Sequence, residues 1–294
     1  MKFLIAIGSK EFSEPTLRIG TQIARAFQAE ITILYVGEPV SSFAAHEVHL
    51  AQENLKKWNF DHPGVEVLEW AFNFLAEHGY ITPKTIKAGF QGNRLVASGP
   101  RRYQVELAGT YCEEVKLILR QGDIIPELRD EVQRSFIDVT IIGGSQKRRM
   151  AHDLVQYLDS SIFVVNTYDP EKKYRILLPV DDSRGTRKAI NFGIRVARAY
   201  GLAVDTLTVS KRESFGPGYR GAARRATKFL NRAGVANQAH FIVGDPVEEI
   251  SKFGCREHII VMGVSHKHPL KKFFTGSKPL KLMEVCSAPI LIVK

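Results

Sequence analysis

The chain has few cysteines and no long apolar run, and both scarcities limit what it can be. Its three cysteines, Cys112, Cys255 and Cys286, lie far apart and form no C-x-x-C pair. An odd number of isolated cysteines indicates neither a disulfide framework nor a thiolate metal site. No segment approaches the roughly 20 consecutive apolar residues of a membrane-spanning helix. The N-terminus turns polar after about five apolar residues, too few for a signal peptide. We therefore expect a folded, cytoplasmic protein without a membrane span.

Motifs for nucleic-acid binding are also missing, although the net charge is +10. Basic proteins attract phosphates through their summed field. The basic residues are mostly spread singly along predicted helices, however, and there is no helix-turn-helix, zinc-finger spacing or aromatic-plus-basic sheet pattern. We interpret the charge as solvated helix faces and expect no specific nucleic-acid partner.

The sequence contains an internal repeat. The order strand, helix, strand from KFLIAIGS to ITILYV recurs from YRILLPVDDS to VDTLTV, so that Val36 corresponds to Val209. Further along, DVTIIGGS parallels HIIVMGVS, and Gly143 corresponds to Gly263. The short apolar runs are typical of strands covered on both faces, and amphipathic helices alternate with them. The pattern predicts an α/β fold with two tandem doubly wound domains and mainly parallel sheets.

The repeat also predicts the domain boundaries, 1–168 and 173–294. The polar stretch TYDPEKK, residues 167–173, contains Pro170 and is the expected linker. The first domain carries an insertion at about 46–110, for which we expect one helix around Val48 to Trp58 and another around Val65 to His78. A loop rich in Gly89, Gly92, Gly99 and Pro100 and then short strands are expected to follow. The insertion is either an elaboration packed on the first domain or a partner surface.

Candidate ligand-binding residues are concentrated in the second half. Parallel α/β sheets bind ligands at the carboxyl ends of their strands. The first strand of the second half ends in Asp181, Asp182 and Ser183. A carboxylate here is suited to accept a hydrogen bond from a ribose hydroxyl or to contact Mg²⁺. Asp182 and Ser183 suit equally well the capping of the following helix.

The segment after Gly263 is rich in glycine and cations. Gly276 and Ser277 suit a helix N-terminus that holds a phosphate, because glycine lets backbone N–H groups come close. His266 and Lys278 belong to a cationic stretch that suits an anionic ligand. The alternative is a solvated basic loop. A lone His-x-His at His266 and His268 is too weak a pattern to indicate a metal site.

These residues resemble the universal stress protein family, and the chain is identified as a tandem-domain member. Nucleotide-binding members show G-x2-G-x9-G-[ST] after the fourth strand and an aspartate ending the first. Gly263, Gly276 and Ser277 match that motif, Asp181 matches the aspartate, and Val209 matches the residue whose backbone meets adenine. His266 replaces the second glycine of the motif.

The resemblance implies a stress-response or regulatory protein that binds ATP, ADP or AMP in its second half. It implies no catalytic residue and at most slow hydrolysis of ATP, with Asp181 as the candidate Mg²⁺ contact and no other metal site. The implied nucleotide-binding residues are Pro179, Asp181, Ser183, Val209, Met262, Gly263, His266, Gly276, Ser277 and Lys278.

The first half lacks several of these parts. Gly8 takes the place of Asp181, and no Gly-Ser pair follows Gly144 in the shortened segment after it. We expect the first site to be empty of nucleotide or to bind it weakly.

One other function stays open, and a second is disfavoured. An interaction module in which both sites are vestigial would bind a protein partner or pair with itself. A synthetase of the related α-hydrolase superfamily would need an S-G-G-x-D-S loop, which is absent. The apolar final strands, SSIFVVN and SAPILIVK, are expected to pair as an intramolecular pseudo-dimer, because each would otherwise leave an exposed sheet edge. An unidentified protein partner and a further homodimer stay open too.

Overall fold

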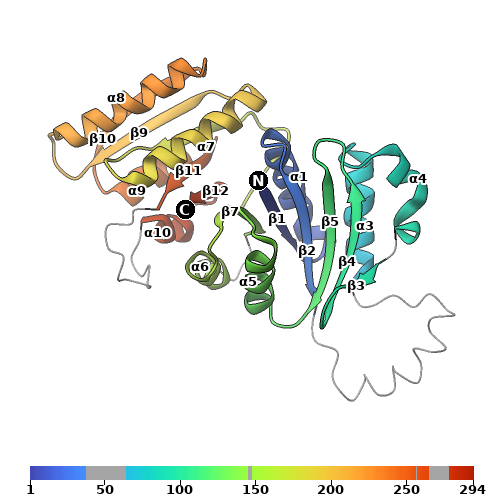
Figure 1. The fold of residues 1–294 in the computed structure, drawn as a ribbon. Coiled ribbons are helices and arrows are strands. Elements are labelled where there is room, and N and C mark those ends of the chain that lie inside the picture. The colour runs from blue at the N-terminus through green and yellow to red at the C-terminus, as the bar shows by residue number, and fades with distance from the viewer. Residues whose placement is uncertain (38–63, 94, 145–147, 256, 265–277) are drawn as a thin grey trace.

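The computed structural model describes residues 1–37, 64–93, 95–144, 148–255, 257–264 and 278–294. Strands and helices alternate in both halves of the chain (Figure 1). The first half comprises β1 (Lys2–Ile7), α1 (Lys10–Ala26), β2 (Glu30–Gly37), α3 (Val65–Glu77), α4 (Pro83–Gly92), β3 (Val96–Ala97), β4 (Arg102–Ala108), β5 (Glu114–Gln121), α5 (Ile124–Ser135), β6 (Val139–Gly143), α6 (Arg148–Tyr157) and β7 (Ser161–Val165). The second half comprises β8 (Arg175–Pro179), α7 (Arg184–Tyr200), β9 (Val204–Ser210), α8 (Pro217–Arg232), β10 (Asn237–Val243), α9 (Pro246–Gly254), β11 (His258–Gly263), α10 (Lys278–Val285) and β12 (Ile290–Val293).

The strands form one continuous sheet in the order β10-β9-β8-β11-β12-β7-β6-β1-β2-β5-β4-β3. β1 lies between β2 and β6, as β8 lies between β9 and β11, and all of these neighbours are parallel. The first half repeats the strand order of the second and adds β4 and β3 at its outer edge. β4 runs antiparallel to β5, and β3 runs antiparallel to β4. The two tandem, doubly wound, mainly parallel units predicted from the sequence are therefore confirmed.

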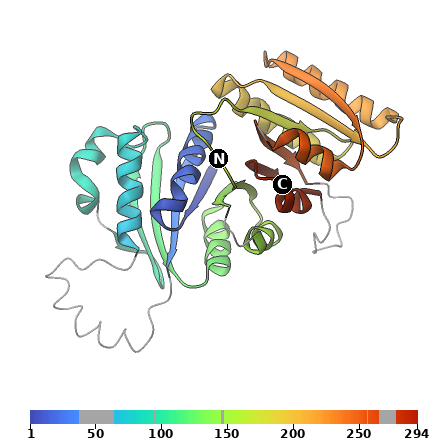
Figure 2. The same ribbon diagram turned by 180° about the vertical axis from the view of Figure 1, so that it is seen from behind.

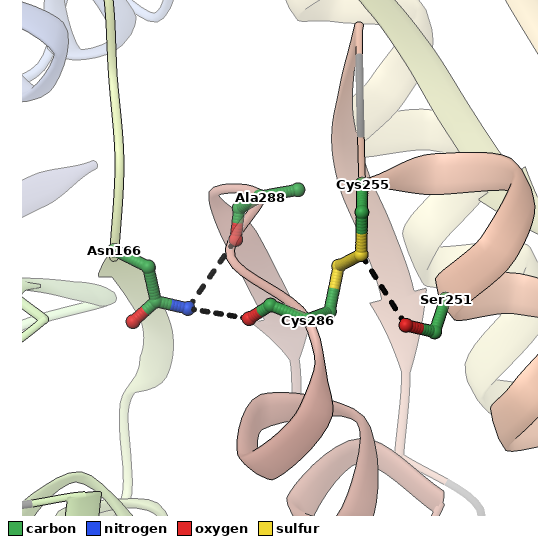
Figure 3. The surroundings of a disulfide bond; sticks show 5 residues. All are labelled: Asn166, Ser251, Cys255, Cys286 and Ala288. Atoms are coloured by element: carbon green, nitrogen blue, oxygen red, sulfur yellow. Dashed lines mark hydrogen bonds between the residues drawn. A yellow bond between two sulfur atoms is a disulfide. The ribbon is translucent and has the colours of Figure 1, made fainter.

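The final strands of the two halves join the sheet across its middle. β7 and β12 pair antiparallel, with Val164 opposite Ile290 and Ile162 opposite Ile292. The side-chain amide of Asn166 also donates to the carbonyl oxygens of Cys286 and Ala288, at 3.2 and 3.3 Å (Figure 3). Each strand thus covers the edge that the other would leave open. The predicted intramolecular pairing of these two strands is confirmed.

Helices cover both faces of the sheet, and each face has its own apolar core (Figures 1 and 2). Side chains of α1, α3, α7 and α8 belong to one core, and side chains of α5, α6, α9 and α10 belong to the other. The first core crosses the joint between the halves, because the rings of Phe27 and Phe192 lie 4.3 Å apart. Arg195 lies over the Phe27 ring at 4.5 Å and donates to the Phe27 carbonyl oxygen. The halves therefore share aromatic packing as well as a strand pair.

The insertion differs in part from its prediction. The helix expected around Val65 to His78 is α3, and the expected short strands are β3 and β4. The helix expected around Val48 to Trp58 lies outside the described residues. The predicted glycine-rich loop is wrong where Gly89 and Gly92 lie, because α4 occupies those positions. Thr82 caps α4 and Pro83 begins it, while Gly89 interrupts the helical backbone at φ 71°. Helix-starting residues outweighed the glycines here.

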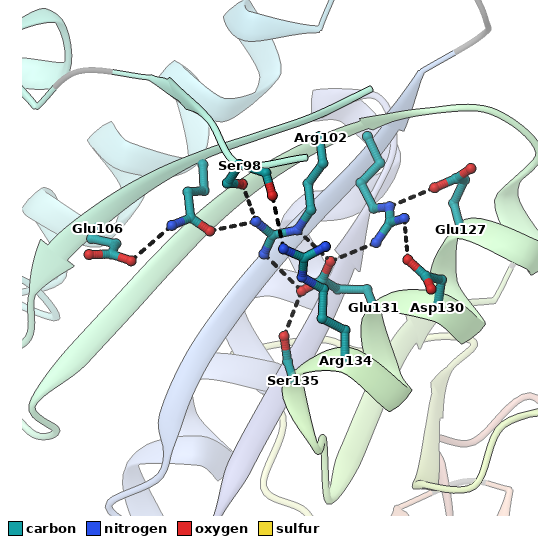
Figure 4. Close-up of polar contacts among 10 residues, drawn as sticks. Ser98, Arg102, Glu106, Glu127, Asp130, Glu131, Arg134 and Ser135 are labelled. Carbon is teal, nitrogen blue, oxygen red and sulfur yellow. Dashed lines mark hydrogen bonds and ion pairs between the residues drawn. The ribbon is translucent and has the colours of Figure 1, made fainter. Parts of the chain in front are cut away.

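A buried ion-pair cluster attaches the insertion to α5 (Figure 4). Glu131 of α5 is fully buried, and its carboxylate accepts hydrogen bonds from Arg102 of β4 at 2.9 and 3.0 Å and from Arg120 of β5 at 2.8 Å. Burial alone would raise the pKa of Glu131, but the bonds from Arg102, Ser135 and Arg120 lower that pKa to about 2. Glu131 is therefore ionised near neutral pH, and its two arginines hold β4 and β5 against α5.

The expectation that the cysteines form no disulfide is wrong for one pair. Cys255 and Cys286 form a disulfide, although they lie 31 residues apart in the sequence (Figure 3). Cys255 follows α9 and Cys286 follows α10, and packing of these two helices brings the Cα atoms to 5.7 Å. Sequence spacing could not show this, because only the tertiary fold brings the two helix ends together. Among the described helices, none has both the length and the apolar character of a membrane span.

Candidate functional site

The candidate site lies at the carboxyl ends of β8, β9 and β11. β8 is the middle strand of the three, with Pro179 opposite Leu207 of β9 and Leu177 opposite Ile260 of β11. Because all three strands are parallel, their carboxyl ends meet at one edge of the sheet. Of the predicted residues, Pro179, Val209, Met262 and Gly263 end these strands at that edge. Val209 and Met262 are 8% and 5% exposed, so their side chains belong to the core beneath the site.

Asp181 follows β8 and is held in place by the first turn of α7. Its Oδ1 atom accepts hydrogen bonds from the Thr186 hydroxyl at 2.6 Å and from the Ser183 backbone N–H at 3.0 Å. The Asp181 side chain is only half-buried. The structure therefore orients the carboxylate through Oδ1 and leaves the side chain accessible to a ligand.

The environment keeps Asp181 ionised. Burial alone would raise the pKa of this carboxyl group, but hydrogen bonds from Ser183 and Thr186 and the charge of Lys278 hold its pKa below the usual value. Lys278 begins α10 and is exposed. Since the charge of Lys278 contributes to this lowering, its side chain lies within electrostatic range of Asp181. An anionic acceptor and a cation therefore lie together here, which suits a ligand that carries both hydroxyl and phosphate groups.

The two residues after Asp181 serve the neighbouring helices. Ser183 is the N-cap of α7, and its side chain accepts a hydrogen bond from the Thr186 backbone N–H at 3.4 Å. This confirms the prediction that Ser183 caps the following helix. Asp182 points toward the start of α8, because a Cβ atom added at Gly218 would lie 3.3 Å from its Oδ2 atom. Asp181 is thus the acid of this loop best placed for a ligand.

A close backbone contact near the site was missed by the sequence analysis. Gly185 in the first turn of α7 lies against Gly263 at the end of β11, and a Cβ atom added at Gly263 would come within 2.1 Å of the Gly185 backbone. A Cβ atom added at Gly185 would come within 2.3 Å of the Val264 carbonyl oxygen. Gly263 is therefore required for packing, whatever its part in binding. The remaining predicted residues, His266, Gly276 and Ser277, lie outside the described residues.

The corresponding edge of the first half has different chemistry. Phe3 pairs with Val139 in the first half, and Ile176 pairs with Ile259 in the second, so Phe3 corresponds to Ile176. Counted from these residues, Gly8 takes the position that Asp181 has in the second half. The Gly8 backbone N–H donates to the Ser13 hydroxyl at 2.8 Å. In the second half the corresponding loop is instead hydrogen-bonded to the Asp181 carboxylate. The first half therefore offers no acidic group at this position.

A second polar cluster, also missed, lies at the opposite ends of the same strands. Asp205 of β9 accepts hydrogen bonds from Arg175 at 2.6 and 2.9 Å and from His258 Nε2 at 2.9 Å. Burial alone would raise the pKa of Asp205, but these bonds hold it well below its usual range. His258 Nδ1 is buried without a hydrogen-bond partner among the described residues. Because this cluster lies at the amino ends of the strands, we assign it to stability. The described residues hold no group of three or more metal-ligating side chains.

Comparisons with known proteins agree with this architecture. Residues 174–294 match the family model described as the Universal stress protein family. No curated protein matches the chain in sequence. A solved structure of a functionally unknown protein from Pseudomonas aeruginosa has 15% identity and a TM-score of 0.60, covering 100% of this chain and 92% of that one. A universal stress protein from Archaeoglobus fulgidus has 14% identity and a TM-score of 0.56, covering 100% and 96%. At these identities the solved structures establish the tandem fold alone.

Proposed function

We propose, because residues 174–294 match the Universal stress protein family model, that this chain is a regulatory protein that binds one adenine nucleotide, ATP, ADP or AMP, in its second half. The domains would run from 1 to 168 and from 173 to 294. Nucleotide binding would alter the contacts that the chain makes with a protein partner in the cytoplasm. The role is binding rather than catalysis, with slow hydrolysis of ATP at most.

The observation that carries this proposal is the ionised, oriented carboxylate of Asp181. This half-buried carboxylate lies at the carboxyl edge of the sheet, where a ribose hydroxyl would donate to it. Lys278, which begins α10, would then meet the phosphates together with the predicted Gly276 and Ser277. Asp181 is also the group that would contact Mg²⁺ carried by the nucleotide.

Two measurements test the proposal. Mass spectrometry of the gently purified protein should detect an adenine nucleotide carried through purification. Calorimetry of the stripped protein with ATP, ADP and AMP should then give one site per chain. Gly8→Asp should leave the stoichiometry at one, because the first half would still lack a Gly-Ser pair after Gly144. Two equal sites would contradict the asymmetry, and no binding at all would favour an interaction module with both sites vestigial.

A further inference from the structure

The first half contains a pocket at the edge where the second half has its candidate site. The pocket has a volume of about 460 Å³ and lies among the carboxyl ends of β1, β2 and β6 and the helices α1, α5 and α6. Small-molecule sites are commonly about 300–1,000 Å³ and occur at this edge of doubly wound sheets. Position and size are therefore those of a small-molecule site.

The lining is apolar rather than ionic. Nine of the described lining residues have apolar side chains, and none of the described lining residues is charged. The polar side chains are three hydroxyls, of which Ser13 already accepts the Gly8 N–H. The described lining residues offer an anionic nucleotide no cation in exchange for its lost hydration, which is unfavourable. The lining favours a neutral ligand.

Two large apolar residues of the lining are exposed to solvent. Phe12 and Ile124 both line the pocket, yet their side chains are 75% and 44% exposed. Large apolar side chains gathered on a concave surface are typical of a site that a ligand covers. A peptide strand is a poor occupant, because β1, β2 and β6 already pair with neighbours on both sides.

From these observations we propose that the first half binds a neutral, largely apolar small molecule in this pocket. The hydroxyl of Ser9, which makes no capping bond to α1, would accept or donate the one hydrogen bond that such a ligand needs. The two halves would then use the same edge of the repeat for two ligand classes, a nucleotide in the second and an apolar molecule in the first. This proposal does not depend on nucleotide binding.

Titration of the full chain with Nile red, a neutral apolar dye whose emission shifts in apolar surroundings, tests the proposal. One saturable site is expected, and excess ATP should not displace the dye. Gly8→Leu should weaken dye binding by roughly tenfold or more, because a filled pocket offers few contacts to a ligand. An added Cβ atom at Gly8 meets nothing within 4 Å, so the variant should fold. Gly216→Leu is the matched control, since its Cβ atom also meets nothing within 4 Å and it lies outside the pocket.

A second variant separates pocket filling from misfolding. Val36 is half-buried and lines the pocket, so Val36→Asp places a carboxylate in the pocket without enlarging the side chain much. Dye binding should fall, while the circular dichroism spectrum stays that of the wild type. The proposal is overturned if the wild type shows no saturable site, if both variants bind the dye as the wild type does, or if ATP displaces the dye.

Discussion

The Thr186 hydroxyl donates a hydrogen bond to Asp181 Oδ1 at 2.6 Å, and this bond orients the acid that we propose contacts a nucleotide. The bond joins the end of β8 to the first turn of α7, so the geometry of the candidate site depends on where that helix begins. It also favours the ionised form of Asp181, because a hydrogen bond to a carboxylate stabilises its charge.

Replacing Asp181 should weaken nucleotide binding. Asp181→Asn keeps the shape of the side chain but removes its charge, and a hydrogen bond to a charged group contributes about 1.5–3 kcal/mol. We expect the affinity for ATP to fall by roughly 10- to 150-fold in calorimetry. Thr186→Val is the matched variant, because it keeps the carboxylate and removes only its orienting bond. The affinity of Thr186→Val for ATP should lie between those of the wild type and Asp181→Asn. An unchanged affinity in Asp181→Asn would contradict the role assigned to Asp181.

Adding a side chain at Gly263 should destabilise the fold whether or not a nucleotide binds. In Gly263→Ala the new Cβ atom would lie 2.1 Å from the Gly185 backbone, which cannot move without shifting α7. We expect a loss of about 1–3 kcal/mol in the free energy of unfolding, the usual cost of overpacking. Gly143→Ala is the control in the first half, where the nearest atom is Thr16 Oγ1 at 3.0 Å. Denaturant unfolding of the ligand-free protein compares the two, and equal losses would contradict the argument.

The sequence predicted the features that depend on local pattern and repetition. Apolar runs alternating with amphipathic helices predicted both parallel units, and the apolar final strands predicted the pairing of β7 with β12. The loop acid Asp181 could be found because it follows a strand. The contact of Gly185 with Gly263 could not, because it depends on how closely a helix approaches a strand. The pair of Glu131 with Arg102 likewise joins elements that only the three-dimensional arrangement brings together.

Neutralising Glu131 should destabilise the first half in a pH-dependent way. Glu131→Gln would leave two buried arginines without their shared carboxylate, and breaking a buried ion pair costs about 3–5 kcal/mol near neutral pH. Because the pKa of Glu131 is lowered from 4.5 to about 2 in the folded protein, its stabilising contribution is present above pH 4.5 and is lost as the pH falls toward 2. The difference in unfolding free energy between wild type and variant should therefore shrink over that range.

The control for this experiment lies in the same hairpin. Glu106 of β4 is exposed and accepts a hydrogen bond from Gln104 at 2.9 Å. Glu106→Gln should change the unfolding free energy little, because exposed polar contacts contribute little to stability. A pH-independent difference for Glu131→Gln would show that the variant acts through packing rather than through charge.

Reducing the disulfide should destabilise the second half without changing its fold. Cys255 and Cys286 close a loop across a sequence separation of 31 residues, and the cross-link limits the conformations of the unfolded chain. In the chain-entropy account, a loop of this length contributes about 3–4 kcal/mol. Thermal unfolding with and without reductant should show a lower midpoint in the reduced protein, and Cys286→Ser should reproduce it without reductant. Cys112→Ser is the control, because Cys112 is a free, half-buried cysteine. Because reducing compartments oppose disulfides, thiol titration of the denatured protein decides whether the purified chain holds this bond. One titratable thiol per chain would mean that the bond is formed, whereas three, together with equal midpoints in both redox states, would contradict a stabilising disulfide.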